Sequence, residues 1–178
     1  YPFDYLQNSA LYFSSPLKAI CKSADKSYMF VKSGVGYGWV DTRDIALVSD
    51  ETEAEMRGFK LKTPKNDKTP LYGANGEFLE RINIGSVIFD SKAPKRADSG
   101  YAYMVDAKTD SGFLPTPDNL GIDGVRHRAY LLFGEPYGWG GYLFNRDCSM
   151  FIRDIFIGYG VLLPRNSADQ AARYTDIS

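Results

Sequence analysis

The stretch GEPYGWGGYLFNRDCSMF, residues 134–151, decides how the C-terminal part of this chain folds. It runs from a glycine-rich aromatic loop directly into an apolar segment. Asp147 is a favoured N-cap residue, and the apolar residues after it recur at helical spacing. These residues are Met150, Phe151, Ile152, Ile155 and Phe156. The pattern predicts a helix whose first residue is Cys148.

A cysteine at the first position of a helix is well placed to react. The unpaired N–H groups and the positive end of the helix dipole stabilise a thiolate, which is the nucleophilic form. The alternative is that Cys148 is a small apolar core residue, as free cysteines often are. Gly138, Gly140 and Gly141 favour the reactive interpretation, because glycine lets a backbone approach a ligand closely or adopt positive φ. We expect Cys148 to be alkylated faster than Cys21, which we interpret as a core residue.

Three motifs in this part of the chain resemble the NlpC family of bacterial cell-wall cysteine peptidases, compact relatives of papain that cut peptidoglycan stem peptides. The motifs are residues 137–141 (YGWGG), 147–149 (DCS) and 163–167 (LPRNS). The resemblance covers residues 124–178. The family usually has glycine directly after the DCS triplet, whereas this chain has Met150, which we expect to reshape the adjoining wall.

The resemblance implies a role for several residues. Cys148 would be the nucleophile, Asp147 and Ser149 would contact the substrate, and Tyr137 would form a hydrogen-bonding wall beside the thiol. In the branch that carries SH3-like domains, the bond cut follows D-glutamate in L-Ala-γ-D-Glu-diamino acid. The aspartate there helps to hold the free amino group of the L-alanine, as a carboxylate recognises an ammonium. No cofactor and no metal is implied.

The chain has one histidine, and its position does not suit a catalytic base. A cysteine peptidase needs an imidazole within hydrogen-bond reach of the sulfur. His127 precedes the cysteine, in residues 124–133, which suit a helix. In the NlpC family the histidine follows the cysteine, on a strand packed against the nucleophile helix, and a third polar residue orients it. We therefore interpret His127 as a surface residue and the chain as an N-terminal piece of a longer enzyme, inactive alone because both residues lie beyond Ser178.

The motif after the nucleophile helix has a structural explanation. Pro164 follows a short apolar run and precedes a second helix, in which Ser167 and Gln170 are spaced as a capping box. Arg165 is either a structural anchor or a residue of the cleft, and we favour the anchor.

The residues upstream predict short strands. Residues 28–31 and 38–40 indicate a β-hairpin, and residues 101–105 and 112–114 repeat its pattern. The pair formed by residues 75 and 76, Asn-Gly, favours a tight primed turn. Short strands and many turns predict two small barrels in tandem.

These barrels resemble the bacterial SH3-like domains that precede NlpC domains. The resemblance rests on residues 25–31 and 37–41, with residues 5–7 as part of a clip segment. In the family the first barrel closes one end of the cleft, which would place Tyr37 or Trp39 beside the substrate. The alternative is that Trp39 lies in the core of its own barrel.

The fold class expected is α+β, with two SH3-like β-barrels followed by the helical, nucleophile-bearing part of a papain-like NlpC domain. The expected divisions are a clip segment (1–9), a first barrel (10–57), a second barrel (58–115), a linker (116–123) and the N-terminal part of the peptidase domain (124–178).

Composition narrows the partners. The net charge of −1 with interspersed signs gives no basic stripe, which argues against nucleic acid. No apolar run reaches the length of a membrane span. The chain begins at Tyr1 without a signal-like start, so we expect an extracytoplasmic protein, in the periplasm or cell envelope, whose signal has been removed; cytoplasmic cell-wall recycling stays open.

Two functions follow from these patterns. In the first, the chain is part of a cysteine endopeptidase that cuts peptidoglycan stem peptides after D-glutamate. In the second, it is a cell-wall binding or scaffold module whose barrels hold peptide or glycan beside an inert peptidase remnant. The sequence leaves open the diamino acid and the oligomeric state.

Overall fold

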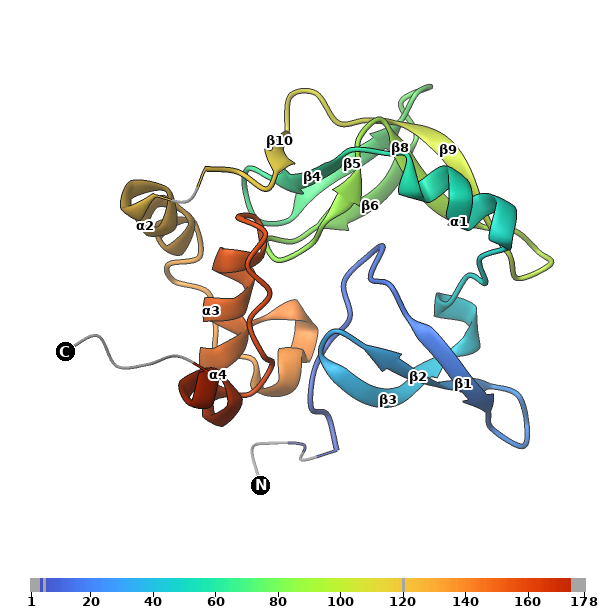
Figure 1. The fold of residues 1–178 in the computed structure, drawn as a ribbon, viewed down its shortest axis with the longest axis horizontal. Helices are drawn as coiled ribbons and strands as arrows, with labels where there is room; N and C mark the ends of the chain where they lie inside the picture. Colours follow the sequence, from blue (N-terminus) through green and yellow to red (C-terminus); the bar gives the residue numbers. More distant parts are fainter. Residues whose placement is uncertain (1–3, 5, 120, 174–178) are drawn as a thin grey trace.

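The computed structural model of the chain describes residue 4, residues 6–119 and residues 121–173. Its elements form a small N-terminal sheet, a second β unit and a helical unit in chain order (Figure 1). The architecture is α+β, which confirms the predicted fold class. In these described ranges, no helix has both the length and the apolar character needed to cross a membrane.

The first unit is an antiparallel sheet in the order β1-β2-β3, and it contains the predicted hairpin. Met29 and Val31 point to one face of the hairpin and pack with Ile45, because successive strand residues alternate between faces. The elements are β1 (Lys18–Lys22), β2 (Tyr28–Ser33), β3 (Gly36–Asp41) and the 3-10 helix η1 (Thr42–Asp44).

The opposite face of this hairpin carries exposed aromatic rings. Phe30 pairs with Trp39, and its ring centroid lies 5.1 Å from that of Trp39 and 6.1 Å from that of Tyr37. Trp39 is 55% exposed. The alternative that Trp39 fills the barrel core is therefore wrong, because the register places it on the face away from Met29 and Val31.

The prediction that Cys21 is a core residue is also wrong. Cys21 is an exposed free thiol, and every residue of β1 is exposed. The apolar core beside this sheet forms from Met29, Val31 and Ile45 with Leu17 and Val40, and it includes no residue of β1.

The second β unit contains two sheets, with strand orders β10-β4-β7 and β6-β5-β9-β8. Helix α1 (Asp50–Arg57) connects it to the first unit. The strands are β4 (Leu61–Pro64), β5 (Thr69–Gly73), β6 (Phe78–Ile82), β7 (Ile88–Phe89), β8 (Lys92–Arg96), β9 (Ala102–Lys108) and β10 (Phe113–Thr116). Its apolar core consists of Leu71, Ile82, Ile88, Ala93, Ala107 and Phe113.

The second predicted hairpin does not form. β9 pairs with β5 and β8, whereas β10 pairs with β4. Alternation of apolar residues identifies a strand and its buried face, but it does not identify the partner strand. The turn between β5 and β6 does lie where it was expected, with Gly76 N–H donating to Gly73 O at 3.0 Å. Of its Asn-Gly pair only Gly76 has positive φ, so the turn is not of the primed type.

The helical unit packs against the second β unit. Ile155 and Leu132 are buried against Ile84, which follows β6. The helices are α2 (Ile122–Leu131), the 3-10 segment η2 (Trp139–Phe144), α3 (Cys148–Ile157) and α4 (Ser167–Arg173). Figure 1 shows α3 lying between α2 and the loop of η2.

The segment between the second β unit and α2 is anchored to the end of α3. Thr116 Oγ1 donates to Gly158 O at 2.8 Å, and the backbone N–H of Asp118 donates to the same oxygen at 3.1 Å. The predicted domain boundaries stay a prediction. Residues 1–3 and 5 of the predicted clip, and residues 174–178, lie outside the described residues.

Candidate active site

Helix α3 begins at Cys148, as the sequence predicts. Asp147 is its N-cap, with an extended backbone, and its Oδ1 accepts from the backbone N–H of Met150 at 3.0 Å. Met150 is fully buried, whereas Cys148 is exposed. The expectation that Met150 reshapes the wall beside the thiol is therefore not met, because two residues of helix turn it to the opposite side.

Both neighbours of the exposed thiol are held inside the protein. Asp147 is 7% exposed and Ser149 is 6% exposed. Arg165 contacts both of them: its Nη2 donates to Asp147 Oδ2 at 2.6 Å, and its Nη1 donates to Ser149 Oγ at 3.0 Å. Arg165 is thus a buried anchor, in line with the favoured interpretation of its motif.

The carboxylate of Asp147 stays ionised in this setting. Burial opposes its charge, but hydrogen bonds from Arg165, from Met150 N–H and from Ser149 lower the pKa of Asp147 below its ordinary value. Gly140 N–H adds a further contact to Oδ2 at 3.2 Å. A substrate ammonium would therefore share this carboxylate with Arg165.

Tyr137 lies within electrostatic reach of the thiol. The pKa of its hydroxyl is raised by partial desolvation and then by the negative charges of Asp147 and Cys148. A bridge between Tyr137 and Arg146, with Gly138 N–H donating to Arg146 O at 3.1 Å, fixes this residue beside the start of α3. The structure thus brings together Tyr137, Asp147, Cys148 and Ser149, while their catalytic and substrate-binding roles stay a prediction.

The glycine loop is shaped for a segment of this chain. Gly140 and Gly141 have positive φ, at 58° and 81°, as the sequence suggested. A Cβ at Gly140 would lie 2.0 Å from Gln7 O, and one at Gly141 would lie 2.7 Å from Ala10 Cβ. In the described residues, the close approach that these glycines permit is made by the N-terminal segment.

Arg146, next to the N-cap, is the centre of a buried charge cluster that sequence reasoning missed. Its Nε donates to Asp154 Oδ2 at 2.8 Å, its Nη1 to Glu135 Oε2 at 2.6 Å and its Nη2 to Asp67 Oδ1 at 2.7 Å. Tyr12 Oη donates to the same Asp154 oxygen at 2.5 Å. These partners come from four separate segments, so no local motif announces the cluster.

Arg146 contacts three carboxylates in this cluster, and burial raises the pKa values of two of them. Burial raises the pKa of Asp154 to about 6, with Arg146 and the hydroxyl of Tyr12 acting against the shift. Burial, and then Asp67, raise the pKa of Glu135. The pKa of Arg146 is raised, since its anionic surroundings outweigh its burial.

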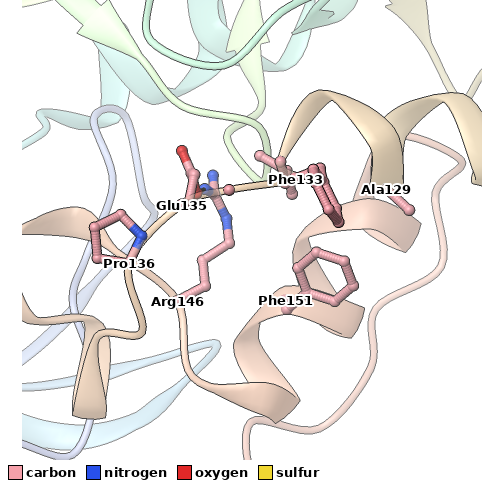
Figure 2. A pocket seen from close by; sticks show the side chains of 8 residues that line it. Ala129, Phe133, Glu135, Pro136, Arg146 and Phe151 are labelled. Carbon is pink, nitrogen blue, oxygen red and sulfur yellow. Dashed lines mark hydrogen bonds and ion pairs between the residues drawn. The ribbon is translucent and has the colours of Figure 1, made fainter.

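A pocket of about 220 Å³ lies beside Arg146, between the end of α2 and α3 (Figure 2). Phe151 and Ala129 form apolar walls, and Glu135 lies next to Arg146. Phe151 follows Cys148 by one helical turn and shares its side of α3, but Cys148 does not line the pocket. The candidate nucleophile is exposed and lies outside this pocket.

Two other expectations concern side chains near the site. His127 is exposed on α2, as predicted, and within the described part of the chain it makes no hydrogen bond or ion pair. The capping box is wrong: the Nε2 of Gln170 donates to Ser149 O at 3.0 Å and to Pro164 O at 2.8 Å. This side chain therefore joins α4 to the start of α3.

Comparison with known proteins assigns both ends of the chain. Residues 1–41 match the family model described as SH3 domain (SH3b1 type), and residues 134–178 match that of the NlpC/P60 family. No curated protein matches the chain.

Solved structures resemble nearly the whole chain. An NlpC/P60 endopeptidase from Photobacterium damselae subsp. piscicida has a TM-score of 0.84 and 33% identity, over 96% of this chain and 39% of that one. An NlpC/P60 family protein from Bacillus cereus ATCC 10987 has a TM-score of 0.63 and 16% identity, over 90% of this chain and 57% of that one. The second likeness concerns the fold alone. This chain therefore spans well under two thirds of the length of either structure.

The fold and the site define a modular α+β protein in which SH3-like strands precede a helical unit with an exposed thiol at a helix start. The chain belongs to the NlpC/P60 family and carries an SH3b domain.

Proposed function

We propose that the helical unit hydrolyses peptidoglycan stem peptides, with Cys148 as the nucleophile. The observation that carries the proposal is the exposed thiol at the start of α3, between two buried and hydrogen-bonded neighbours. Membership of the NlpC/P60 family supports a peptidase. We also propose an extracytoplasmic location, because the proposed substrate is a component of the cell wall.

The chemistry follows from the position of the sulfur. The thiolate attacks the carbonyl carbon of the scissile amide, and the backbone N–H groups at the start of α3 stabilise the oxyanion that forms. The amine leaves with a proton, a thioester to Cys148 remains, and water hydrolyses it. These chemical steps need an imidazole beside the sulfur that accepts the thiol proton and returns it to the leaving amine. We do not assign that role to His127, which is exposed on α2.

We further propose that the bond cut follows D-glutamate in L-Ala-γ-D-Glu-diamino acid. Asp147 supports this choice, because it is an ionised carboxylate directly beside the nucleophile. The L-alanine ammonium would add a donor to a carboxylate that Arg165 already contacts. An acylated amino end would offer no positive charge there, so stem peptides with a free amino end should be preferred.

A binding function for the SH3b unit is favoured by one observation of its own. Tyr37 and Trp39 are exposed and their rings gather around Phe30 on one face of β2 and β3. Exposed rings of this kind stack on sugars and on extended peptides. We propose that this face holds peptidoglycan near the helical unit.

The test uses the complete gene product and synthetic L-Ala-γ-D-Glu-diamino acid peptide. We expect release of L-Ala-D-Glu, its loss in Cys148→Ala, and retention of activity in the matched variants Cys21→Ala and His127→Ala. We also expect N-acetylation of the L-alanine to lower kcat/KM. Undiminished cleavage by Cys148→Ala, or its loss in His127→Ala, would overturn the proposed chemistry. Equal kcat/KM for free and acetylated peptide would remove Asp147 from recognition.

A further inference from the structure

One guanidinium group braces both residues that flank the candidate nucleophile. Arg165 Nη1 donates to Asp147 Oδ1 at 3.1 Å and to Ser149 Oγ at 3.0 Å, while Nη2 donates to Asp147 Oδ2 at 2.6 Å. The paired donors of arginine fit a carboxylate in a fixed orientation, which a lysine ammonium does not impose. The contact therefore fixes the orientation of the first turn of α3 about the helix axis. It also places a positive charge beside Asp147.

Because of helix geometry, this contact also determines the direction in which the Cys148 side chain points. Successive residues of an α-helix point about 100° apart. With Asp147 at the N-cap and Ser149 at the second helical position both drawn toward Arg165, the residue between them must point outward. Cys148 is exposed, whereas its two neighbours are buried.

The brace is completed by a residue from the other end of the chain. Arg165 Nε donates to Ser9 Oγ at 2.8 Å. The same N-terminal segment contacts the glycine loop, where Gln7 Nε2 donates to Gly140 O at 3.3 Å. Gly140 N–H in turn contacts Asp147. The segment thus touches the N-cap from two directions, through Arg165 and through Gly140.

We propose that Arg165 is a positioning residue for Cys148, and that Ser9 completes this positioning from the N-terminal segment. Arg165 acts through Asp147 and Ser149, by fixing the first turn of α3 and by balancing the negative charge beside the sulfur. This role rests on the proposed function only insofar as Cys148 is the nucleophile, since the orientation of the thiol can be measured without any substrate.

The experiment measures alkylation of Cys148 by iodoacetamide across pH, with exposed Cys21 as the internal reference and peptide mapping to separate the two. Arg165→Met should lower the rate at Cys148 relative to Cys21 by about tenfold at neutral pH, because an unbalanced Asp147 carboxylate disfavours a neighbouring thiolate. Its pH profile should move to higher pH. Arg165→Lys, which keeps the charge but not the fork, should recover part of the rate.

Arg126→Met is the matched control, because this arginine is exposed on α2 and its only close partner is Asp123 in the described residues. It should leave the Cys148 to Cys21 ratio and the profile unchanged. A folded Arg165→Met variant with an unchanged ratio and profile would overturn the proposal. If circular dichroism shows that this variant is unfolded, Ser9→Ala decides instead: we expect a smaller fall in the ratio, and no change would overturn the proposal.

Turnover by the complete gene product gives an independent measure. Arg165→Met should lower kcat more than it raises KM, because a misplaced nucleophile still permits binding. A changed alkylation ratio together with a wild-type protein that does not cleave stem peptides would uphold the positioning of Cys148 and reject the proposed function. An unchanged alkylation ratio in Arg165→Met, together with a wild-type enzyme that cleaves stem peptides, would uphold the proposed function and reject the positioning role of Arg165.

Discussion

Two buried arginines near the start of α3 have opposite surroundings. Arg146 contacts three carboxylates, those of Asp67, Glu135 and Asp154, and joins segments far apart in the chain. Arg165 contacts a single carboxylate, that of Asp147, together with hydroxyl groups. Both arginines form ion pairs, and their side chains are 2% exposed (Arg146) and 6% exposed (Arg165). They differ in the number of carboxylates that they contact, and Arg165 contacts both chain neighbours of Cys148.

This difference suggests that Arg146 serves the stability of the fold, whereas Arg165 serves the candidate active site. The Arg146 cluster ties the N-terminal segment, the second β unit and α3 to one another, so its loss should affect the whole structure. The Arg165 cluster holds the first turn of α3 and joins it to Ser9 of the N-terminal segment, so its loss should affect mainly the behaviour of Cys148. In some proteins buried ion pairs contribute to the specificity of the structure more than to its stability, and these two clusters allow that idea to be tested within one protein.

The largest expected effect is that of Arg146→Met. It removes the cation that three carboxylates share, although Lys68 still lies 3.5 Å from Glu135 and Arg153 lies 3.9 Å from Asp154. Removing one partner of a buried ion pair costs about 3–5 kcal/mol. The free energy of unfolding should fall by that amount in denaturant titrations at neutral pH, with Arg126→Met as the control. A loss below about 1 kcal/mol would show that the cluster does not hold the units together.

The next effect is a pH dependence that Asp154→Asn should remove. The pKa of Asp154 is raised to about 6 by burial, above its value in an unfolded chain, so the folded state binds this proton more tightly. Its contribution to stability is therefore largest below about pH 4 and falls as pH rises through 6, by up to about 3 kcal/mol. The free energy of unfolding, measured between pH 4 and 7, should fall less steeply in the variant.

Asp41→Asn is the matched control for this experiment. The pKa of Asp41 is lowered to about 2 by hydrogen bonds from Arg43, so its titration lies below that pH window. The slope between pH 4 and 7 should equal that of the wild type. An equally steep slope in Asp154→Asn would assign the pH dependence to Glu135, whose pKa is raised as well.

The smallest expected loss of stability is that of Gly140→Ala, in the loop that contacts Asp147 beside Arg165. Gly140→Ala places a Cβ against Gln7 O at a residue with positive φ, which should cost about 2 kcal/mol of stability. The change should also lower the alkylation of Cys148 relative to Cys21, because Gly140 N–H contacts Asp147. Gly76→Ala has positive φ without a close neighbour and serves as the control. Equal alkylation ratios in the two variants would separate the glycine loop from the nucleophile.

The local features of the site could be predicted from the sequence, and its long-range contacts could not. The N-cap at Asp147 and the helix start at Cys148 depend on neighbouring residues, so their pattern was sufficient. The partners of Arg146 and the contact of Ser9 with Arg165 connect distant segments of the chain. No periodicity or spacing encodes such a pairing.

The same limit explains the errors in the β units. Alternation identified the strand that became β9, but its pairing with β5 and β8 instead of β10 depends on packing across the unit. For Trp39 the sequence left open a place beside the substrate or in the core of its barrel, and the strand register placed the ring outside that core. Composition describes what a side chain favours, and register decides where it lies.

The contacts of the N-terminal segment also determine when the site can form during folding. Gln7 with Gly140, Tyr12 with Asp154 and Ser9 with Arg165 are separated by 133, 142 and 156 residues in the chain. Contacts that close such long loops carry a large entropic cost and form slowly. We therefore expect the surroundings of Cys148 to become ordered late in folding, after both β units. A newly made chain would then carry its thiol unoriented until its N-terminal segment has reached the helical unit.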